Sequence, residues 1–154
     1  MILKTPSPHL LYRGSWQTRG FSPTAFFVAG EAEKRRQQQR VFEELERVTE
    51  TRLAPNWDAY QAEPVSDKTY GYAHHFLMAL PFGMPPPAVG AEPDGHLTFE
   101  WYRTPHRTLS VSVSPEGELH YAVLIGRRKF HGTEPFDYDI PETLLTWIRE
   151  VYAE

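Results

Sequence analysis

The chain contains no cysteine. This absence excludes disulfide bonds, thiolate zinc sites, iron–sulfur ligation and a cysteine nucleophile. The chain also lacks any apolar run near the roughly 18 residues of a membrane span, so we expect no membrane partner. It has no phosphate-binding loop, dinucleotide fingerprint or paired-histidine helix motif, and we predict no cofactor.

Acidic residues are absent from residues 1–30, although 20 occur in the 154-residue chain. Residues 1–40 hold seven basic and two acidic side chains, a net charge of +5, whereas residues 41–154 hold nine basic and 18 acidic ones, a net charge of −9. Such an asymmetry is typical of an interaction arm. The hydrophobic fraction of 40% is ordinary for a globular protein. We predict a basic arm over residues 1–30 and a single domain over residues 31–154.

The predicted arm has no helical or strand periodicity, yet it is rich in aromatic side chains. Aromatic rings anchor protein interfaces because they bury a large area at low entropic cost. We predict that the arm binds either the acidic body of its own chain, residues 41–154, or another chain. That other chain can be a second copy of this protein. The predicted contact residues are Tyr12, Trp16, Phe21, Phe26, Phe27, Arg35 and Arg36.

Two helices are predicted in the first half of the domain. Residues 31–53 carry an apolar stripe with helical spacing, made of Val41, Phe42, Leu45 and Val48. Ser66 is a suitable N-cap for a second helix over residues 66–80. Pro55 and Pro81 follow the two helices, which proline cannot continue.

The hydrophobic pattern then changes to the period of two that indicates strands. Strands are predicted at His96–Tyr102, Thr108–Ser114 and Glu118–Ile125, with a short first strand at Ala88–Ala91. A last helix over residues 140–153 follows, with a capping box predicted between Asp139 and Glu142. The fold class is therefore α+β, with a three- to four-stranded antiparallel meander and all helices on one sheet face.

The polar face of this sheet holds the residue types of nucleophilic catalysis. The hairpin registers pair Ser112 with His120 and Phe99 with Val111. They predict a row of Thr98, Ser112 and His120 with Glu100 nearby. A flat, solvated face provides no oxyanion hole, so we predict no catalytic residue there. A small hydrolase would require a pocket containing His120 or His131.

The segment from His131 to Asp139 also brings together possible metal ligands, including Glu134 and Asp137. Because Asp139 is expected to cap the last helix, the remaining set is incomplete, and we predict no metal site.

Nucleic-acid binding is the alternative function. Basic residues can contact a phosphate backbone, and interleaved aromatic rings can stack on bases. The acidic body and the pI near 6.0 count against this function. The candidate residues are Lys34, Arg35, Arg36, Arg40, Arg127, Arg128 and Lys129.

The most distinctive local pattern is Asn56-Trp57-Asp58-Ala59-Tyr60-Gln61-Ala62-Glu63-Pro64. We expect Trp57 to fill the core and Asp58 to bond backbone amides in a turn. The pattern resembles the Gly/Asn-Trp-Asp-x-Tyr-x-Ala-x-Pro motif of a family of small uncharacterised bacterial proteins. The resemblance covers about residues 53–153 and implies an α+β layout and a bacterial, cytoplasmic setting, with no transferable activity. Ala59 and Gln61 stand where that motif has glycine, so we expect a changed loop geometry.

Together these features favour a non-enzymatic protein-interaction module, such as an accessory, regulatory or antitoxin/immunity-like protein. An acidic body can steer a basic partner toward it.

Overall fold

The computed structural model describes residues 23–154, and the chain divides into two units, Met1–Arg36 and Gln37–Glu154. Tyr12, Trp16 and Phe21 lie outside the described residues. The backbone of Phe26 and Phe27 lies in helix α2, but their side chains are also outside the described part.

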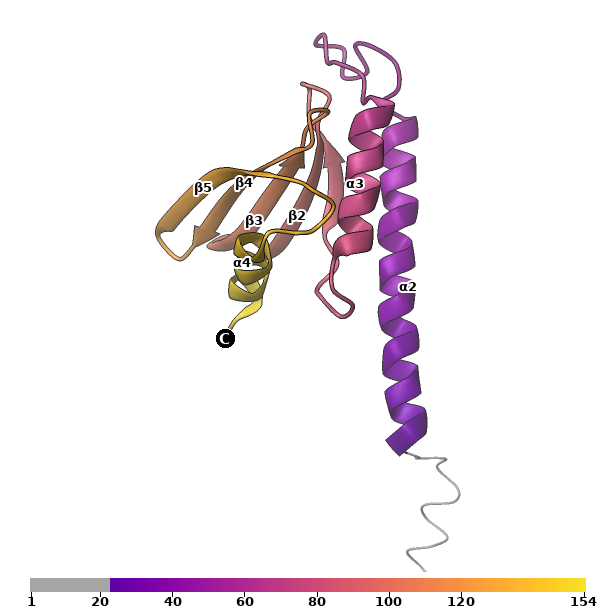
Figure 1. Cartoon of the computed structure of the whole chain (residues 1–154), viewed down its shortest axis with the longest axis vertical. Coiled ribbons are helices and arrows are strands. Elements are labelled where there is room, and N and C mark those ends of the chain that lie inside the picture. Colours follow the sequence, from indigo (N-terminus) through magenta and orange to yellow (C-terminus); the bar gives the residue numbers. More distant parts are fainter. Residues whose placement is uncertain (1–22) are drawn as a thin grey trace, which may run out of the picture. The chain divides into compact units, whose positions relative to one another are not determined.

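Three helices and five strands make up the described chain (Figure 1). The elements in order are α2 (Pro23–Glu50), α3 (Asp67–Ala79), β1 (Ala88–Ala91), β2 (Leu97–Thr104), β3 (Arg107–Val113), β4 (Glu118–Ile125), β5 (Arg128–Pro135) and α4 (Glu142–Tyr152). The α+β class is confirmed. Among residues 23–154, no helix is both long and apolar enough to cross a membrane.

The strands form one antiparallel sheet in the order β1-β2-β3-β4-β5. The predicted registers are confirmed, since Phe99 pairs with Val111 and Ser112 pairs with His120. The prediction of three to four strands was too low, because it missed β5. This edge strand has mostly polar side chains on both faces, so its sequence lacks apolar alternation.

One face of the sheet and the helices enclose a single core. Figure 1 shows α4 across the sheet, where it contacts β2, β3 and β4, while α3 contacts β2 and β3. The Phe76 ring of α3 stacks on Phe99 at a centroid distance of 5.0 Å. Trp101 is fully buried, and its Nε1–H donates to the carbonyl oxygen of Pro85 at 2.8 Å.

Helix α2 differs from the prediction at both ends. Helix α2 begins at Pro23 rather than residue 31, so the predicted arm boundary at residue 30 falls inside it. Proline fits the first turn of a helix, and nothing between Pro23 and Gly30 ends one. Helix α2 ends at Glu50. In the turn that follows, the N–H of Arg52 donates to the carbonyl oxygen of Thr49.

The capping-box prediction for the last helix was wrong. The N-cap of α4 is Pro141, and it makes no side-chain capping bond. Asp139 lies two residues too early to reach the first turn, and Glu142 instead pairs with Arg149 at 2.7 Å. By contrast, Ser66 caps α3 as predicted, because its hydroxyl accepts the N–H of Thr69 at 3.1 Å.

Candidate functional site

The polar sheet face brings together the predicted row and His96, which was not among the predicted site residues. His96 directly precedes β2 and stacks on His120 with ring centroids 5.8 Å apart. Its Nδ1 lies 3.3 Å from the Ser112 hydroxyl, which is buried. His120 is held by Thr133 of β5, at 2.9 Å from its Nδ1.

This arrangement does not form a nucleophilic relay. In a catalytic triad the serine and the carboxylate bond to different ring nitrogens of the histidine. Here Asp94 approaches Nδ1 of His96 at 3.6 Å, and Ser112 faces the same nitrogen. One nitrogen cannot both accept the proton of the serine and donate to the carboxylate. The Ser112 hydroxyl and the Asp94 carboxylate are therefore not joined through the two ring nitrogens of His96.

The segment expected to gather metal ligands is a strand for most of its length. His131 and Glu134 belong to β5, where they pair with Ala122 and Leu119. Asp137 lies beyond the strand end. The predicted loop therefore does not exist in that form, and the two clefts described below include neither His120 nor His131.

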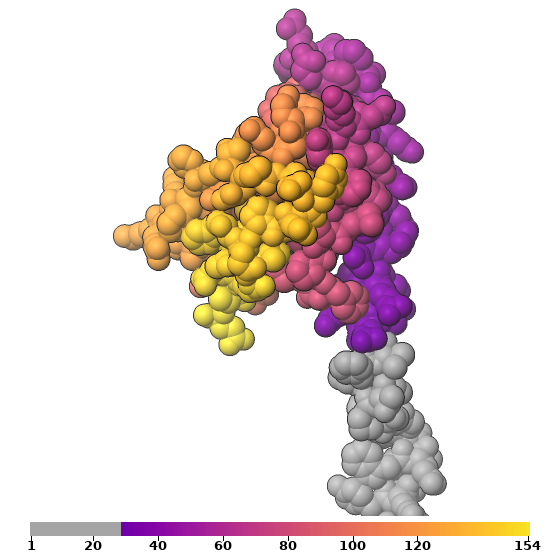
Figure 2. Space-filling model, in the orientation of Figure 1, coloured from indigo at the N-terminus to yellow at the C-terminus, as the bar shows by residue number. Residues whose placement is uncertain are grey.

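A cleft of ≈ 580 Å³ opens where three segments meet. Helix α3 provides one wall, the β3–β4 turn a second and the segment after β5 a third. In Figure 2 the atoms of these segments, coloured magenta, orange and golden yellow, come together on the viewed face. The lining residues are Lys68, Gly71, Tyr72, His75, Pro115, Glu116 and Tyr138.

Three aromatic rings define the cleft. Tyr138 meets His75 edge-on with centroids 5.0 Å apart and lies 6.3 Å from the Tyr72 ring. The Nδ1 atom of His75 is 2.8 Å from the carbonyl oxygen of Gly71, which fixes the imidazole on the helix surface. Edge-on and tilted pairs are favourable for aromatic quadrupoles. The rings are therefore held in place, and Tyr138 and His75 remain exposed.

Tyr138 has an unusual backbone. Its φ is 62°, in the left-handed region that bulky residues rarely adopt, and 54% of its surface is exposed. Residues held in strained conformations are concentrated at functional sites. The exposed ring of Tyr138, held in a costly conformation next to two other rings, makes this cleft the candidate binding site.

The sequence analysis did not identify these aromatic residues. Only the spacing of Tyr72 and His75, three residues apart on α3, could have placed two of them on one helix face. His75 is exposed on this helix face. Tyr138 follows β5, a strand that the sequence analysis missed, so nothing local in the sequence joins it to α3.

The basic candidates lie on two elements. Lys34, Arg35, Arg36 and Arg40 belong to α2, and Arg36 pairs with Glu33 at 2.9 Å. Arg127 precedes β5, Arg128 lies over the Phe130 ring at 5.0 Å, and Lys129 is exposed. Arg40 also lines a shallow groove of ≈ 500 Å³ between α2 and Pro86-Pro87.

The Trp57 loop is structural, although not in the predicted way. Trp57 is half-buried outside the core, beneath the guanidinium of Arg52 at 4.2 Å, and its Nε1–H donates to the Glu63 carbonyl at 2.9 Å. The expectation that it fills the core was wrong. Asp58 does bond backbone amides, accepting from Tyr60 at 2.7 Å and from Ala62 at 3.1 Å.

Three residues of this loop adopt glycine-like conformations, and the first, Asn56 with a φ of 58°, is of a residue type that visits this region routinely. Ala59 and Gln61 have φ values of 64° and 70°. A left-handed conformation costs a residue with a Cβ about 1–2 kcal/mol. We expect Ala59→Gly and Gln61→Gly each to raise the free energy of unfolding by about 0.5–1 kcal/mol, measured by urea denaturation.

The matched control for this prediction is Ala54→Gly. Ala54 is an exposed residue near the same loop, without a positive φ. At Ala54 glycine would increase the entropy of the unfolded chain, and this should lower the free energy of unfolding slightly. If all three glycines destabilise the protein equally, the loop stores no strain at Ala59 and Gln61.

No protein-family model matches the chain, and comparisons with curated proteins and with solved structures found no match. No relative therefore indicates a function for the Trp57 loop or for the cleft. The function proposed below rests on the geometry of the cleft.

Proposed function

We propose that the chain is a protein-interaction module that binds a positively charged, extended segment of a partner protein in the aromatic cleft. The observation that carries this proposal is Tyr138, half-exposed in a left-handed conformation above Tyr72 and His75. Exposed aromatic anchors around a hollow are typical of protein-binding sites. The function involves no catalytic step.

The charge around the cleft supports a cationic ligand. Glu116 lines the cleft, and acidic residues stand next to lining residues in the chain at Asp67, Asp137 and Asp139. Among the described residues that line the cleft, Lys68 is the one lysine or arginine. A lysine or arginine of the partner can lie over the tyrosine faces, because the ring quadrupole attracts cations.

The charge of the whole body acts in the same direction. Residues 41–154 carry a net charge of −9, which raises the encounter rate with a basic partner at low ionic strength. The N-terminal aromatic residues from Tyr12 to Phe27 stay in the proposal as a second contact surface. Nucleic-acid binding remains the alternative, and an oligonucleotide shift at low salt would test it.

The test is selection of binding peptides from a random displayed library against the full chain. We expect the enriched peptides to carry a net positive charge, and Tyr138→Ala to weaken their binding by about ten-fold or more. The control is Tyr102→Ala, because Tyr102 is exposed to 56%, nearly the same fraction as Tyr138, but lies on β2 outside the cleft. Enriched peptides without a positive bias, or equal binding by the Tyr138→Ala variant, would overturn the proposal.

A further inference from the structure

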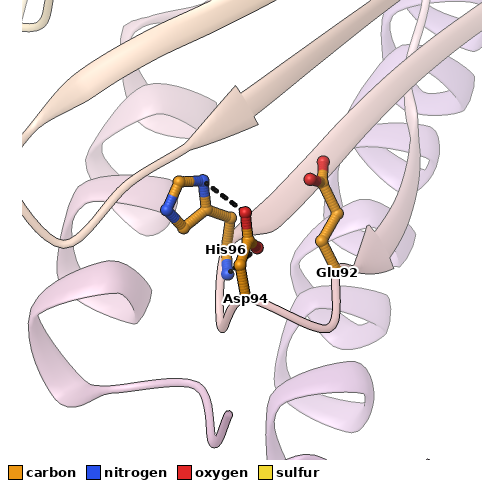
Figure 3. A group of neighbouring side chains, drawn as sticks. All are labelled: Glu92, Asp94 and His96. Carbon is orange, nitrogen blue, oxygen red and sulfur yellow. Dashed lines mark hydrogen bonds and ion pairs between the residues drawn. The ribbon is translucent and has the colours of Figure 1, made fainter. Parts of the chain in front are cut away.

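A group of metal-ligating side chains lies in the hairpin between β1 and β2. We propose that Glu92, Asp94 and His96 bind a divalent transition-metal ion of the zinc type. Figure 3 shows the three side chains on one hairpin, with the Asp94 carboxylate directed at the His96 ring. One ligand atom from each residue lies within 4.8 Å of the other two. The site shares no residue with the aromatic cleft and does not depend on the function proposed for it.

The donor set selects the class of ion. Calcium and magnesium prefer shells made only of oxygen atoms. An imidazole nitrogen combined with two carboxylates is instead a set that suits zinc and its neighbours in the first transition row. Three protein ligands are the usual number for a zinc ion that keeps further positions for water.

The imidazole is already oriented by its neighbours. The His96 side chain is only 19% exposed, and it is held between the Ser112 hydroxyl, 3.3 Å from Nδ1, and the parallel ring of His120. Ser112 and Asp94 approach the same nitrogen, Nδ1, so an ion bound there would replace the Ser112 hydrogen bond, while the stacked His120 ring keeps the imidazole plane in place. Ordering this side chain therefore adds little to the entropic cost of binding.

The two carboxylates are held at the opening of the site. The Thr98 hydroxyl donates to Glu92, and Oδ1 of Asp94 accepts the backbone N–H of His96 at 3.1 Å. The second oxygen of Asp94 lies 3.6 Å from Nδ1 of His96. Ligands at about 2.0–2.2 Å from one ion lie roughly 3.4 Å apart. Asp94 is 57% exposed at its side chain, so it can rotate by the small amount needed.

The backbone of the hairpin keeps the three residues together. The N–H of Glu92 donates to the His96 carbonyl at 2.9 Å, and the N–H of Gly95 donates to Glu92 at 3.0 Å. Gly95 has a φ of +83°, and a Cβ there would lie 2.9 Å from the Pro64 carbonyl oxygen. These contacts fix the backbone of the turn. They therefore also fix the distances between the Cα atoms of the three ligand residues.

Isothermal titration of the full chain with zinc chloride at neutral pH tests the proposal. We expect one ion per chain, and we expect His96→Ala to weaken binding by at least about ten-fold. Asp94→Asn should act in the same direction. The matched control is His106→Ala, because His106 is exposed in the β2–β3 turn and belongs to no ligand group. Magnesium chloride should bind more weakly than zinc chloride.

The result that overturns the proposal is zinc binding that His96→Ala leaves unchanged, or no saturable binding by the wild-type chain. If the His96→Ala variant does not fold, nuclear magnetic resonance of the wild-type histidine rings replaces it. Zinc should then shift the ring signals of His96 and leave those of His106 in place. Equal shifts at both rings would contradict the site.

Discussion

Phe76→Ala is expected to lower the free energy of unfolding by about 3–5 kcal/mol. Phe76 has no exposed surface and lies at the centre of the aromatic core. Its ring stacks on Phe99 at 5.0 Å and meets Trp101 and Phe136 at 6.4 and 5.9 Å. Alanine would leave a cavity between α3 and the sheet, and rigid neighbouring rings cannot collapse to fill it. Urea denaturation followed by tryptophan fluorescence measures the loss.

Met78→Ala is the matched control for the Phe76 substitution. Met78 lies on the same helix but is exposed to 61%. We expect its truncation to change stability by less than about 0.5 kcal/mol. Similar losses at both positions would mean that α3 does not present Phe76 to the sheet as described.

Gly117→Ala is expected to have the second largest effect, a loss of about 2–3 kcal/mol, together with weaker partner binding. Gly117 has a φ of +78° in the turn between β3 and β4. A Cβ there would lie 2.9 Å from the ring of Tyr72, which forms one wall of the cleft. The substitution therefore adds backbone strain and displaces a ring of the proposed binding site. Urea denaturation and peptide affinity measure the two effects separately.

Gly126→Ala separates the two causes. Gly126 also has a positive φ, of +64°, but a Cβ there would meet nothing within 4 Å. This variant should show the cost of the conformation alone, about 1 kcal/mol, and unchanged peptide affinity. If Gly117→Ala costs no more than Gly126→Ala and binds peptide as the wild type does, Tyr72 is not held against the turn.

The sheet registers could be predicted because the relevant signals are local. Short turns such as Pro115–Gly117 fix which residues lie opposite one another, and the alternation of Leu109, Val111 and Val113 fixes the buried face. The edge strand β5 could not be predicted from the same signals. Within β5 only Phe130 is among the apolar residues that pack against the core, so the strand shows no apolar alternation.

The proposed binding site could not be predicted from the sequence for a different reason. Tyr72 and Tyr138 are far apart in the chain, and they meet only because the chain returns past α3 after β5. His96 was predicted to lie on the polar face of the sheet, but its stacking on His120 depends on how the ring turns toward Ser112. Side-chain direction across strands is a tertiary property that hydrophobic periodicity does not encode.

The central claim is that the cleft under Tyr138 binds a cationic segment of a partner protein. The most direct measurement is the dissociation constant of a labelled peptide from the selection, by fluorescence anisotropy, for the wild type and for Tyr138→Ala and Tyr102→Ala. The same titration is repeated with the peptide's basic residues replaced by glutamine. We predict that neutralising the peptide and removing the Tyr138 ring each weaken binding by about ten-fold or more, and that Tyr102→Ala does not. Equal affinity across all of these combinations would contradict the account.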